Sequence, residues 1–210
     1  QRLVQFMADN GSAFLERDNP DRAAENLGRI SDMARRMGRI IRNLRAFARQ
    51  ESDTTATVDL VAAIQAAVDL SLPRCTRDRV ALHWSPPPDP VPVLGGEVRL
   101  SQVLVNLINN AADAMAEQSD PRNITIALRD TPDSVVVEVA DTGPGIDAPE
   151  KIFDPFYTTK AVGAAEGMGL GLSISYGIVQ SFGGDIRGSN TSRGAEFTVA
   201  LTPWTQEAAA

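Results

Sequence analysis

The chain has 210 residues and a formal net charge of −7, with 43% hydrophobic and 22% charged residues, a composition typical of one large or two small globular domains. The acidic balance argues against a nucleic-acid partner, which needs a basic face. No apolar run approaches the roughly 18 residues that cross a membrane, so we expect no membrane contact by this chain. Its single cysteine, Cys75, excludes an internal disulfide and favours a reducing, cytosolic setting.

Residues 1–52 have the hydrophobic spacing of two helices. Apolar residues recur three and four apart over 1–17, and Pro20 then ends the first helix and starts the second. The heptad seam of the second helix consists of Leu27, Ile30, Ala34, Met37, Ile41, Leu44 and Ala48. We therefore predict a helical hairpin that forms a four-helix bundle in a homodimer, although the hairpin also has the option of packing against its own chain.

The second helix also carries a row of arginines with no acidic residue among them. They are Arg35, Arg36, Arg39, Arg42, Arg45 and Arg49. The favoured interpretation is a solvated face, because cations stabilise the C-terminal part of a helix. The other interpretation is a docking face for an acidic partner or for phosphate.

From residue 57 to about residue 204 the pattern changes to mixed helices and strands. The predicted helices are Leu60–Ser71, Glu97–Ala116 and Leu172–Phe182. The predicted strands are Val80–Trp84, Asn123–Leu128, Val135–Val139, Asp185–Arg187 and Glu196–Leu201. This order predicts an α/β sandwich with helices on one face of a sheet. The whole chain is then an α+β protein with a hairpin domain at 1–52 and a second domain at 57–204.

Two asparagines lie one turn apart in the apolar helix Glu97–Ala116. Asn106 and Asn110 share one face of this helix, and amides on a largely buried helix need partners. An amide oxygen is a suitable ligand for Mg²⁺, which keeps its other positions for phosphate and water. The plainer interpretation is a pair of hydrogen-bonded amides.

A carboxylate and two glycines follow the strand Val135–Val139. Asp141 stands at the end of that strand, and Gly143 and Gly145 come directly after it. A carboxylate accepts hydrogen bonds from an exocyclic amine, and glycines let a flat ring approach the backbone. The segment is therefore a candidate base-binding site, although a simple turn has the same composition.

A second glycine-rich stretch leads into the last predicted helix. It contains Gly167, Gly169 and Gly171, and free N–H groups at a helix start favour phosphate. Its late position, after another glycine turn, argues against a dinucleotide-binding Rossmann fold.

The segment between the two glycine-rich stretches contains aromatic residues and one lysine. Phe153, Phe156 and Tyr157 can anchor a polar loop, and Lys160 can reach an anionic phosphate. Residues 160–166 suit a lid that closes over a nucleotide. The plainer interpretation is a loop with a hydrophobic clip.

In this order and spacing, the four motifs resemble the N, G1, F and G2 boxes of the histidine-kinase branch of the GHKL superfamily. Gly194-Ala-Glu-Phe197 stands where that family has its closing glycine motif. The resemblance covers roughly 60–203, and residues 1–50 are similar to the dimerisation domain, most of all in nitrogen-regulation and C4-dicarboxylate sensor kinases. The fold implied is the Bergerat type, a mixed sheet backed by three helices.

The resemblance implies ATP and Mg²⁺ as cofactors and gives roles to individual residues. Asn110 would hold Mg²⁺ against the phosphates, and Asp141 would accept from the adenine amine. Gly143 and Gly145 would shape the adenine pocket. The ATP lid would include Gly167, Gly169, Leu170, Gly171 and Leu172, with Lys160 nearby.

Asn106 separates this chain from the ATP-hydrolysing relatives, such as gyrase and Hsp90, which have a water-activating Glu at the same place. An amide cannot act as a general base near neutral pH, and phosphoryl transfer depends mainly on positioning and charge stabilisation. With Asn106 and Asn110 as catalytic residues, the resemblance implies a protein-histidine kinase. It would lie in the cytoplasm, with an inner-membrane anchor as an option for the parent protein, and would relay the phosphoryl group to a response regulator receiver domain.

The acceptor histidine of such kinases is not in this sequence. Its position would fall a few residues before Gln1, so either the chain begins after it or the kinase is degenerate. The only histidine, His83, lies on the predicted strand Val80–Trp84, where we expect no catalytic duty. We predict that the chain binds Mg·ATP without phosphorylating itself. The rival functions are a GHKL ATPase and a non-catalytic pseudokinase scaffold.

Overall fold

The computed structural model describes residues 56–119, 121–158 and 169–204, together with six helical residues between 21 and 31. The predicted hairpin at 1–52, its dimer seam and its arginine row otherwise lie outside the described residues, as do Lys160 and Gly167. By its contacts the chain divides into one unit of 1–49 with 160–167 and another of 50–159 with 168–210. The described fold belongs to the second unit.

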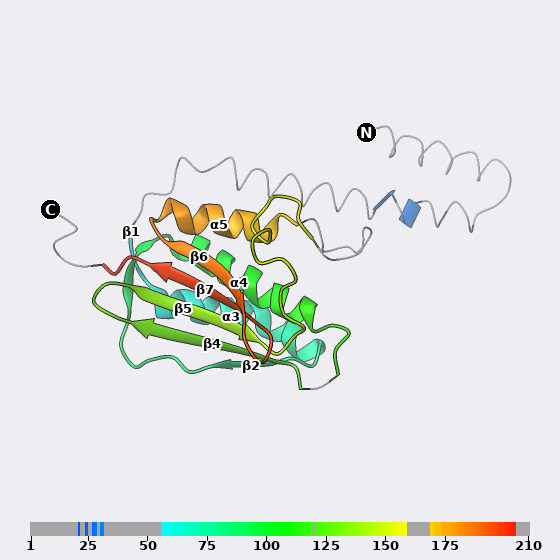
Figure 1. The fold of residues 1–210 in the computed structure, drawn as a ribbon, viewed down its shortest axis with the longest axis horizontal. Helices are drawn as coiled ribbons and strands as arrows, with labels where there is room; N and C mark the ends of the chain where they lie inside the picture. Colours follow the sequence, from blue (N-terminus) through cyan, green and yellow to red (C-terminus); the bar gives the residue numbers. More distant parts are fainter. Residues whose placement is uncertain are drawn as a thin grey trace. The chain divides into compact units, whose positions relative to one another are not determined.

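The second unit contains a five-stranded sheet with three helices on one face (Figure 1). The helices are α3 (Leu60–Arg77), α4 (Glu97–Ala114) and α5 (Gly171–Ser181). The strands are β2 (Ala81–Trp84), β4 (Asn123–Asp130), β5 (Val135–Asp141), β6 (Asp185–Asn190) and β7 (Ala195–Leu201). Their order is β2-β4-β5-β7-β6, and only β2 and β4 pair in parallel. The predicted α+β class, with a mixed sheet backed by helices, is confirmed.

The helix-covered face of the sheet is apolar because alternate residues of its strands are buried. The buried residues of β5 are Val135, Val137 and Val139, which pair with Leu201, Val199 and Phe197 of β7. Side chains of a strand alternate between the two faces. Asp141 continues the same alternation, so its carboxylate lies on the helix-covered face among apolar neighbours.

Helix α3 continues to Arg77, beyond the predicted end at Ser71. Pro73 lies inside the helix and removes one backbone donor, which normally disfavours helix. However, Cys75 beyond the proline is fully buried, and Arg74 makes polar contacts with α4. Burial and tertiary contact therefore outweigh the local cost of the proline. The other elements predicted for 57–204 are present with shifted ends, since α4 ends earlier and β4, β5 and β6 extend further than predicted.

The sequence did not reveal a small second sheet, formed by β1 (Ala56–Asp59) and β3 (Pro92–Gly95) in antiparallel pairing. Neither segment is among the strands that the sequence predicted. Val58 of β1 pairs with Val93 of β3, and both side chains are buried. Asp59 then caps α3 by accepting a hydrogen bond from the Val61 N–H at 3.0 Å. This pairing depends on a distant partner, which the local pattern does not indicate.

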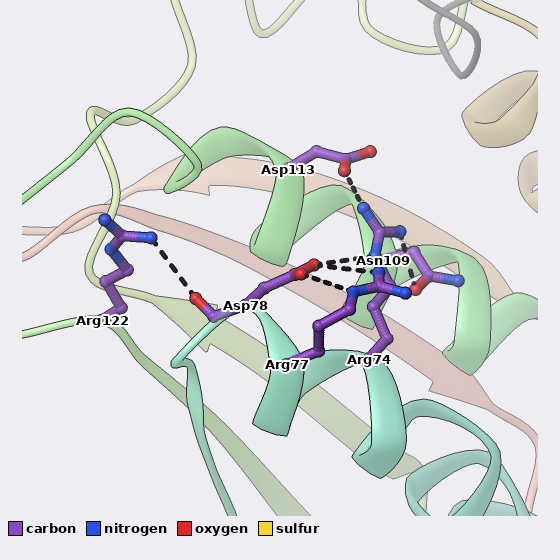
Figure 2. A network of polar contacts seen from close by, with 6 residues as sticks. All are labelled: Arg74, Arg77, Asp78, Asn109, Asp113 and Arg122. Atoms are coloured by element: carbon purple, nitrogen blue, oxygen red, sulfur yellow. Dashed lines mark hydrogen bonds and ion pairs between the residues drawn. The ribbon is translucent and has the colours of Figure 1, made fainter.

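A polar network joins the C-terminal parts of α3 and α4 (Figure 2). Nη1 of Arg74 donates to Oδ1 of Asn109 over 3.0 Å, and Nη2 forms an ion pair with Asp113. Nε of Arg74 also lies 3.3 Å from Oδ2 of Asp78, and Arg122 donates to the Asp78 carbonyl oxygen over 3.3 Å. The two helices are thus held in register by one guanidinium between them.

We expect Arg74→Ala to lower the free energy of unfolding by about 1–3 kcal/mol, because the Arg74 and Asp113 side chains are only 22% and 15% exposed. The matched control is Arg129→Ala, which removes an ion pair with Glu138 from an arginine that is 68% exposed. Such a pair contributes little. Urea unfolding of both variants at neutral pH checks this, and equal losses would contradict it.

Candidate functional site

Asp141 ends β5 and is buried, with 5% of its surface exposed. Its Oδ1 accepts hydrogen bonds from the backbone N–H groups of Gly143 at 2.8 Å and Ala195 at 3.1 Å. Burial raises the pKa of this carboxyl above its ordinary value, and the two N–H groups offset part of that rise. Oδ2 accepts no hydrogen bond from the described residues. It is therefore available as an acceptor for a ligand.

Two glycines allow the backbone to close around Asp141. A Cβ on Gly143 would lie 2.9 Å from Oδ1 of Asp141 and 3.3 Å from Cγ of Met115. A Cβ on Gly194 would lie 2.4 Å from the Asp141 carbonyl oxygen and 2.7 Å from the Gly143 nitrogen. Both approaches are shorter than a side chain permits. The predicted Gly143 and the closing glycine motif at Gly194 thus meet at the same carboxylate.

Thr142 forms hydrogen bonds that connect the segment after Asp141 to the start of β4 and to the loop before it. Its N–H donates to the Asn123 carbonyl at 3.1 Å, and its Oγ1 accepts from the Asn123 N–H at 3.0 Å and donates to the Pro121 carbonyl at 3.0 Å. Gln118 Nε2 donates to the Thr142 carbonyl oxygen at 2.7 Å. The sequence did not single out Thr142 or Gln118, because a small polar residue in a turn gives no periodic signal.

The two predicted asparagines of α4 have different surroundings. Asn106 donates from Nδ2 to Oγ of Ser175 over 3.0 Å, and Ser175 is 2% exposed on α5. Asn110 is half-buried, and its side chain makes no hydrogen bond within the described part of the chain. An amide oxygen without a protein partner can bind a cation, and Asn110 stays a predicted metal ligand. Asn106 is a partnered amide, and Ser175 is a neighbour that the sequence did not reveal.

The start of α5 lies directly against Asn106. A Cβ on Gly171, the first residue of α5, would lie 2.4 Å from Oδ1 of Asn106. Leu170 is the buried N-cap residue and supplies no side-chain hydrogen bond, while Leu172 packs against the core. The first turn therefore has no side-chain cap, and its N–H groups can bind an anion.

Gly169 joins the second glycine-rich stretch to the aromatic segment. Its φ is +63°, and a Cβ there would lie 2.2 Å from the Tyr157 carbonyl oxygen. The Phe156 N–H donates to the Gly169 carbonyl oxygen at 2.9 Å. Phe153 packs against Tyr176 of α5 with ring centroids 5.5 Å apart. Phe153 and Tyr157 pack against the core, as predicted for the aromatic anchor. The prediction is wrong for Phe156, whose side chain is 71% exposed and which contributes only its backbone N–H.

Helix α4 connects the two halves of the candidate site. On α4, Asn106 lies beside Gly171 at the start of α5. At the end of α4, Cβ of Ala114 would lie 3.6 Å from a Cβ on Gly143. Asn110 stands midway between Asn106 and Ala114, which are about 12 Å apart along the helix at roughly 1.5 Å per residue. The buried carboxylate, the free amide and the uncapped helix start therefore lie along one helix.

Comparisons with known proteins agree with this geometry. Residues 95–205 match the family described as histidine kinase-, DNA gyrase B-, and HSP90-like ATPase. The C4-dicarboxylate transport sensor protein DctB of Rhizobium meliloti (strain 1021) is 35% identical over 200 residues, which are 94% of this chain and 31% of that protein. The predicted resemblance to sensor kinases, and to the C4-dicarboxylate sensors among them, is confirmed.

Solved structures show the same fold. A nucleotide-free catalytic domain of histidine kinase ThkA has a TM-score of 0.63 at 30% identity and covers 72% of this chain and 97% of its own. Histidine kinase ThkA in complex with response regulator protein TrrA has a TM-score of 0.68 at 23% identity, with 97% and 59% covered. The chain spans about a third of the length of the curated relatives it matches, 31% and 33% for the two DctB proteins. Among the described helices, none is long and apolar enough to cross a membrane.

Proposed function

Because the chain belongs to the family of histidine kinase-, DNA gyrase B-, and HSP90-like ATPases, we propose that it is the Mg·ATP-binding catalytic part of a two-component sensor histidine kinase. The observation that carries this proposal is the state of Asp141. One carboxylate oxygen is held by the Gly143 and Ala195 N–H groups, and the other accepts no hydrogen bond within the described residues. Such an oxygen suits the exocyclic amine of adenine, since the amine is a donor.

The donor groups near α5 fit the triphosphate and Mg²⁺. No described residue hydrogen-bonds to the Asn110 side chain, and the first turn of α5 has no side-chain cap. Within the described residues, no group of three or more His, Cys, Asp or Glu side chains could hold a metal ion. Mg²⁺ keeps most of its positions for phosphate and water oxygens, so the proposal needs a single protein oxygen. Gly169, Leu170, Gly171 and Leu172 would border the phosphates, with Lys160 and Gly167 in the lid.

Asn106 favours transfer over hydrolysis. Its amide is bonded to Ser175 at 3.0 Å and has no basic site with which to activate water. Bound ATP supplies the γ-phosphoryl group, which would then await a histidine nucleophile. Asn106 and Asn110 would act by positioning, as is general for phosphoryl transfer.

The histidine acceptor, the dimer and the relay complete the proposal. The only histidine of the chain, His83, is exposed on β2 with Nε2 3.3 Å from Oδ1 of Asn123, and we assign it no role in transfer. The heptad seam in 1–52 supports a homodimer. A hairpin domain at 1–52 and a catalytic domain at 57–204 belong to the same proposal. ThkA has been solved with response regulator protein TrrA, which supports a receiver-domain aspartate as the next acceptor, in the cytoplasm.

Incubation with γ-labelled ATP and Mg²⁺ tests the proposal. We expect no label on this chain and no steady ATP turnover, but acid-labile label on a form extended at its N-terminus to include the acceptor histidine. Steady release of phosphate would instead indicate a hydrolase. Label on His83 would contradict the assigned acceptor. An extended form that neither binds nucleotide nor acquires label would indicate a scaffold.

A further inference from the structure

The segment from Asp141 to Ile146 is held from two sides, but unevenly. Several hydrogen bonds hold its first half. Asp141 accepts two from backbone N–H groups, and Thr142 is hydrogen-bonded to Gln118, Pro121 and Asn123. Its second half, around Gly145, depends on β6. Within the described residues, the backbone of Gly145 and Ile146 is hydrogen-bonded to a single side chain, that of Asn190.

The side-chain amide of Asn190 hydrogen-bonds to both the backbone N–H and the backbone carbonyl of Ile146. Oδ1 accepts from the Ile146 N–H at 2.6 Å, and Nδ2 donates to the Ile146 carbonyl oxygen at 2.8 Å. The side-chain amide thus substitutes for a neighbouring strand at the end of β6. Removing it would leave both backbone groups of Ile146 to water.

The neighbouring residues are shaped for this contact. Gly145 has a φ of +88°, and a Cβ there would lie 2.8 Å from Oδ1 of Asn190. Gly188 lies two residues before Asn190 on the same face of β6. A Cβ there would lie 2.4 Å from Cδ1 of Ile152 and 3.2 Å from Cδ1 of Ile146, so the glycine leaves room for both isoleucine side chains. One strand therefore receives the side chain of Ile146 at Gly188 and its backbone at Asn190. The left-handed conformation at Gly145 is thus accompanied by contacts with β6 on both its side-chain side and its backbone side.

We propose that Asn190 is a positioning residue for nucleotide binding, which keeps the Gly145–Ile146 turn in the conformation that receives the base. The inference rests on the proposed function, because Gly143 and Gly145 border the base only if Asp141 binds adenine. Asn190 does not touch the base in this assignment. It acts through the backbone N–H and carbonyl of Ile146. Its removal would lower affinity because the turn that borders the base would no longer be held in its binding conformation.

The test compares the chain with Asn190→Ala and Asn190→Asp. Asn190→Ala removes both hydrogen bonds, and Asn190→Asp keeps the acceptor but loses the donor. Because Asn190 is exposed, we expect a loss of roughly three- to tenfold in affinity for Mg·ADP in Asn190→Ala and a smaller loss in Asn190→Asp. Ser189→Ala, at the neighbouring exposed residue of β6, is the control and should leave affinity unchanged.

Amide hydrogen exchange distinguishes positioning from general destabilisation. We expect the Ile146 N–H to exchange faster in Asn190→Ala, while the Gly143 and Ala195 N–H groups keep their protection. Unchanged affinity beside faster exchange at Ile146 would overturn the inference and leave the proposed function intact. Faster exchange at all three amides would also overturn it, because Asn190 would then support the whole fold. Absence of Mg·ADP binding by the unmodified chain would reject the proposed function, and this inference with it.

Discussion

Asp141→Asn should abolish most adenine-nucleotide binding while leaving the fold intact. The asparagine oxygen can keep the hydrogen bonds from Gly143 and Ala195, which places the new NH₂ group where the adenine amine would approach. Two donors then face each other, and a charge-assisted hydrogen bond is lost. We expect affinity for Mg·ADP to fall roughly 30- to 100-fold, measured by titration calorimetry.

The pH dependence of unfolding provides the control for Asp141→Asn. Burial raises the pKa of Asp141 in the folded protein, so folding favours its protonated form. The stability that this group contributes is present below its unfolded pKa and is lost as pH rises through the higher folded pKa. As pH rises from the unfolded pKa to the folded pKa of Asp141, we therefore expect Asp141→Asn to become more stable relative to the unmodified protein. A variant that loses stability over the same interval would contradict the assignment.

Gly194→Ala should disrupt the same site by crowding it. The added methyl group would lie 2.4 Å from the Asp141 carbonyl oxygen and 2.7 Å from the Gly143 nitrogen, and both are backbone atoms that cannot turn away. The β6–β7 turn must then move off the segment after β5, which breaks the hydrogen bond from Ala195 to Asp141. We expect a loss of about 1–3 kcal/mol in the free energy of unfolding and loss of detectable nucleotide binding.

Gly177→Ala is the matched control for Gly194→Ala. A Cβ on Gly177 would meet no atom within 4 Å, and the residue lies inside α5. Alanine in a helix interior is favoured over glycine by roughly 0.5–1 kcal/mol, so this variant should be more stable and should bind nucleotide normally. Chemical unfolding and Mg·ADP titration of the pair give the comparison. Equal behaviour of the two variants would show that Gly194 does not bear on the site.

The sequence predicted those parts of the site that combine unusual residue types with fixed spacing. Asp141 after a strand, the asparagine pair on α4 and the glycines before α5 each have a local chemical reason that can be read without coordinates. The structure places Gly143 beside Ala114 and Gly171 beside Asn106, so both glycine-rich stretches lie next to α4, which carries Asn110. The binding roles of these residues stay predictions. The helices and the five main strands were predictable for the same reason, since their apolar periodicity is local.

The parts that the sequence did not reveal depend on distant partners. Asn190 has the composition of an ordinary turn residue, and its role follows only from its contact with Ile146. Ser175 gains its importance from Asn106, and Arg74 from α4. Strand β1 forms because Val58 pairs with Val93, far along the chain. Polar contacts between segments carry no period of 2 or 3.6 residues, so pattern reading alone cannot detect them.

Titration of the unmodified chain with ADP, in the presence of Mg²⁺ and again with the metal removed by a chelator, tests the central claim most directly. We predict saturable binding at one site per chain that weakens when Mg²⁺ is removed, because Asp141 would recognise the base and Asn110 would hold the metal against the phosphates. Absence of saturable binding under both conditions would contradict a nucleotide site in this chain.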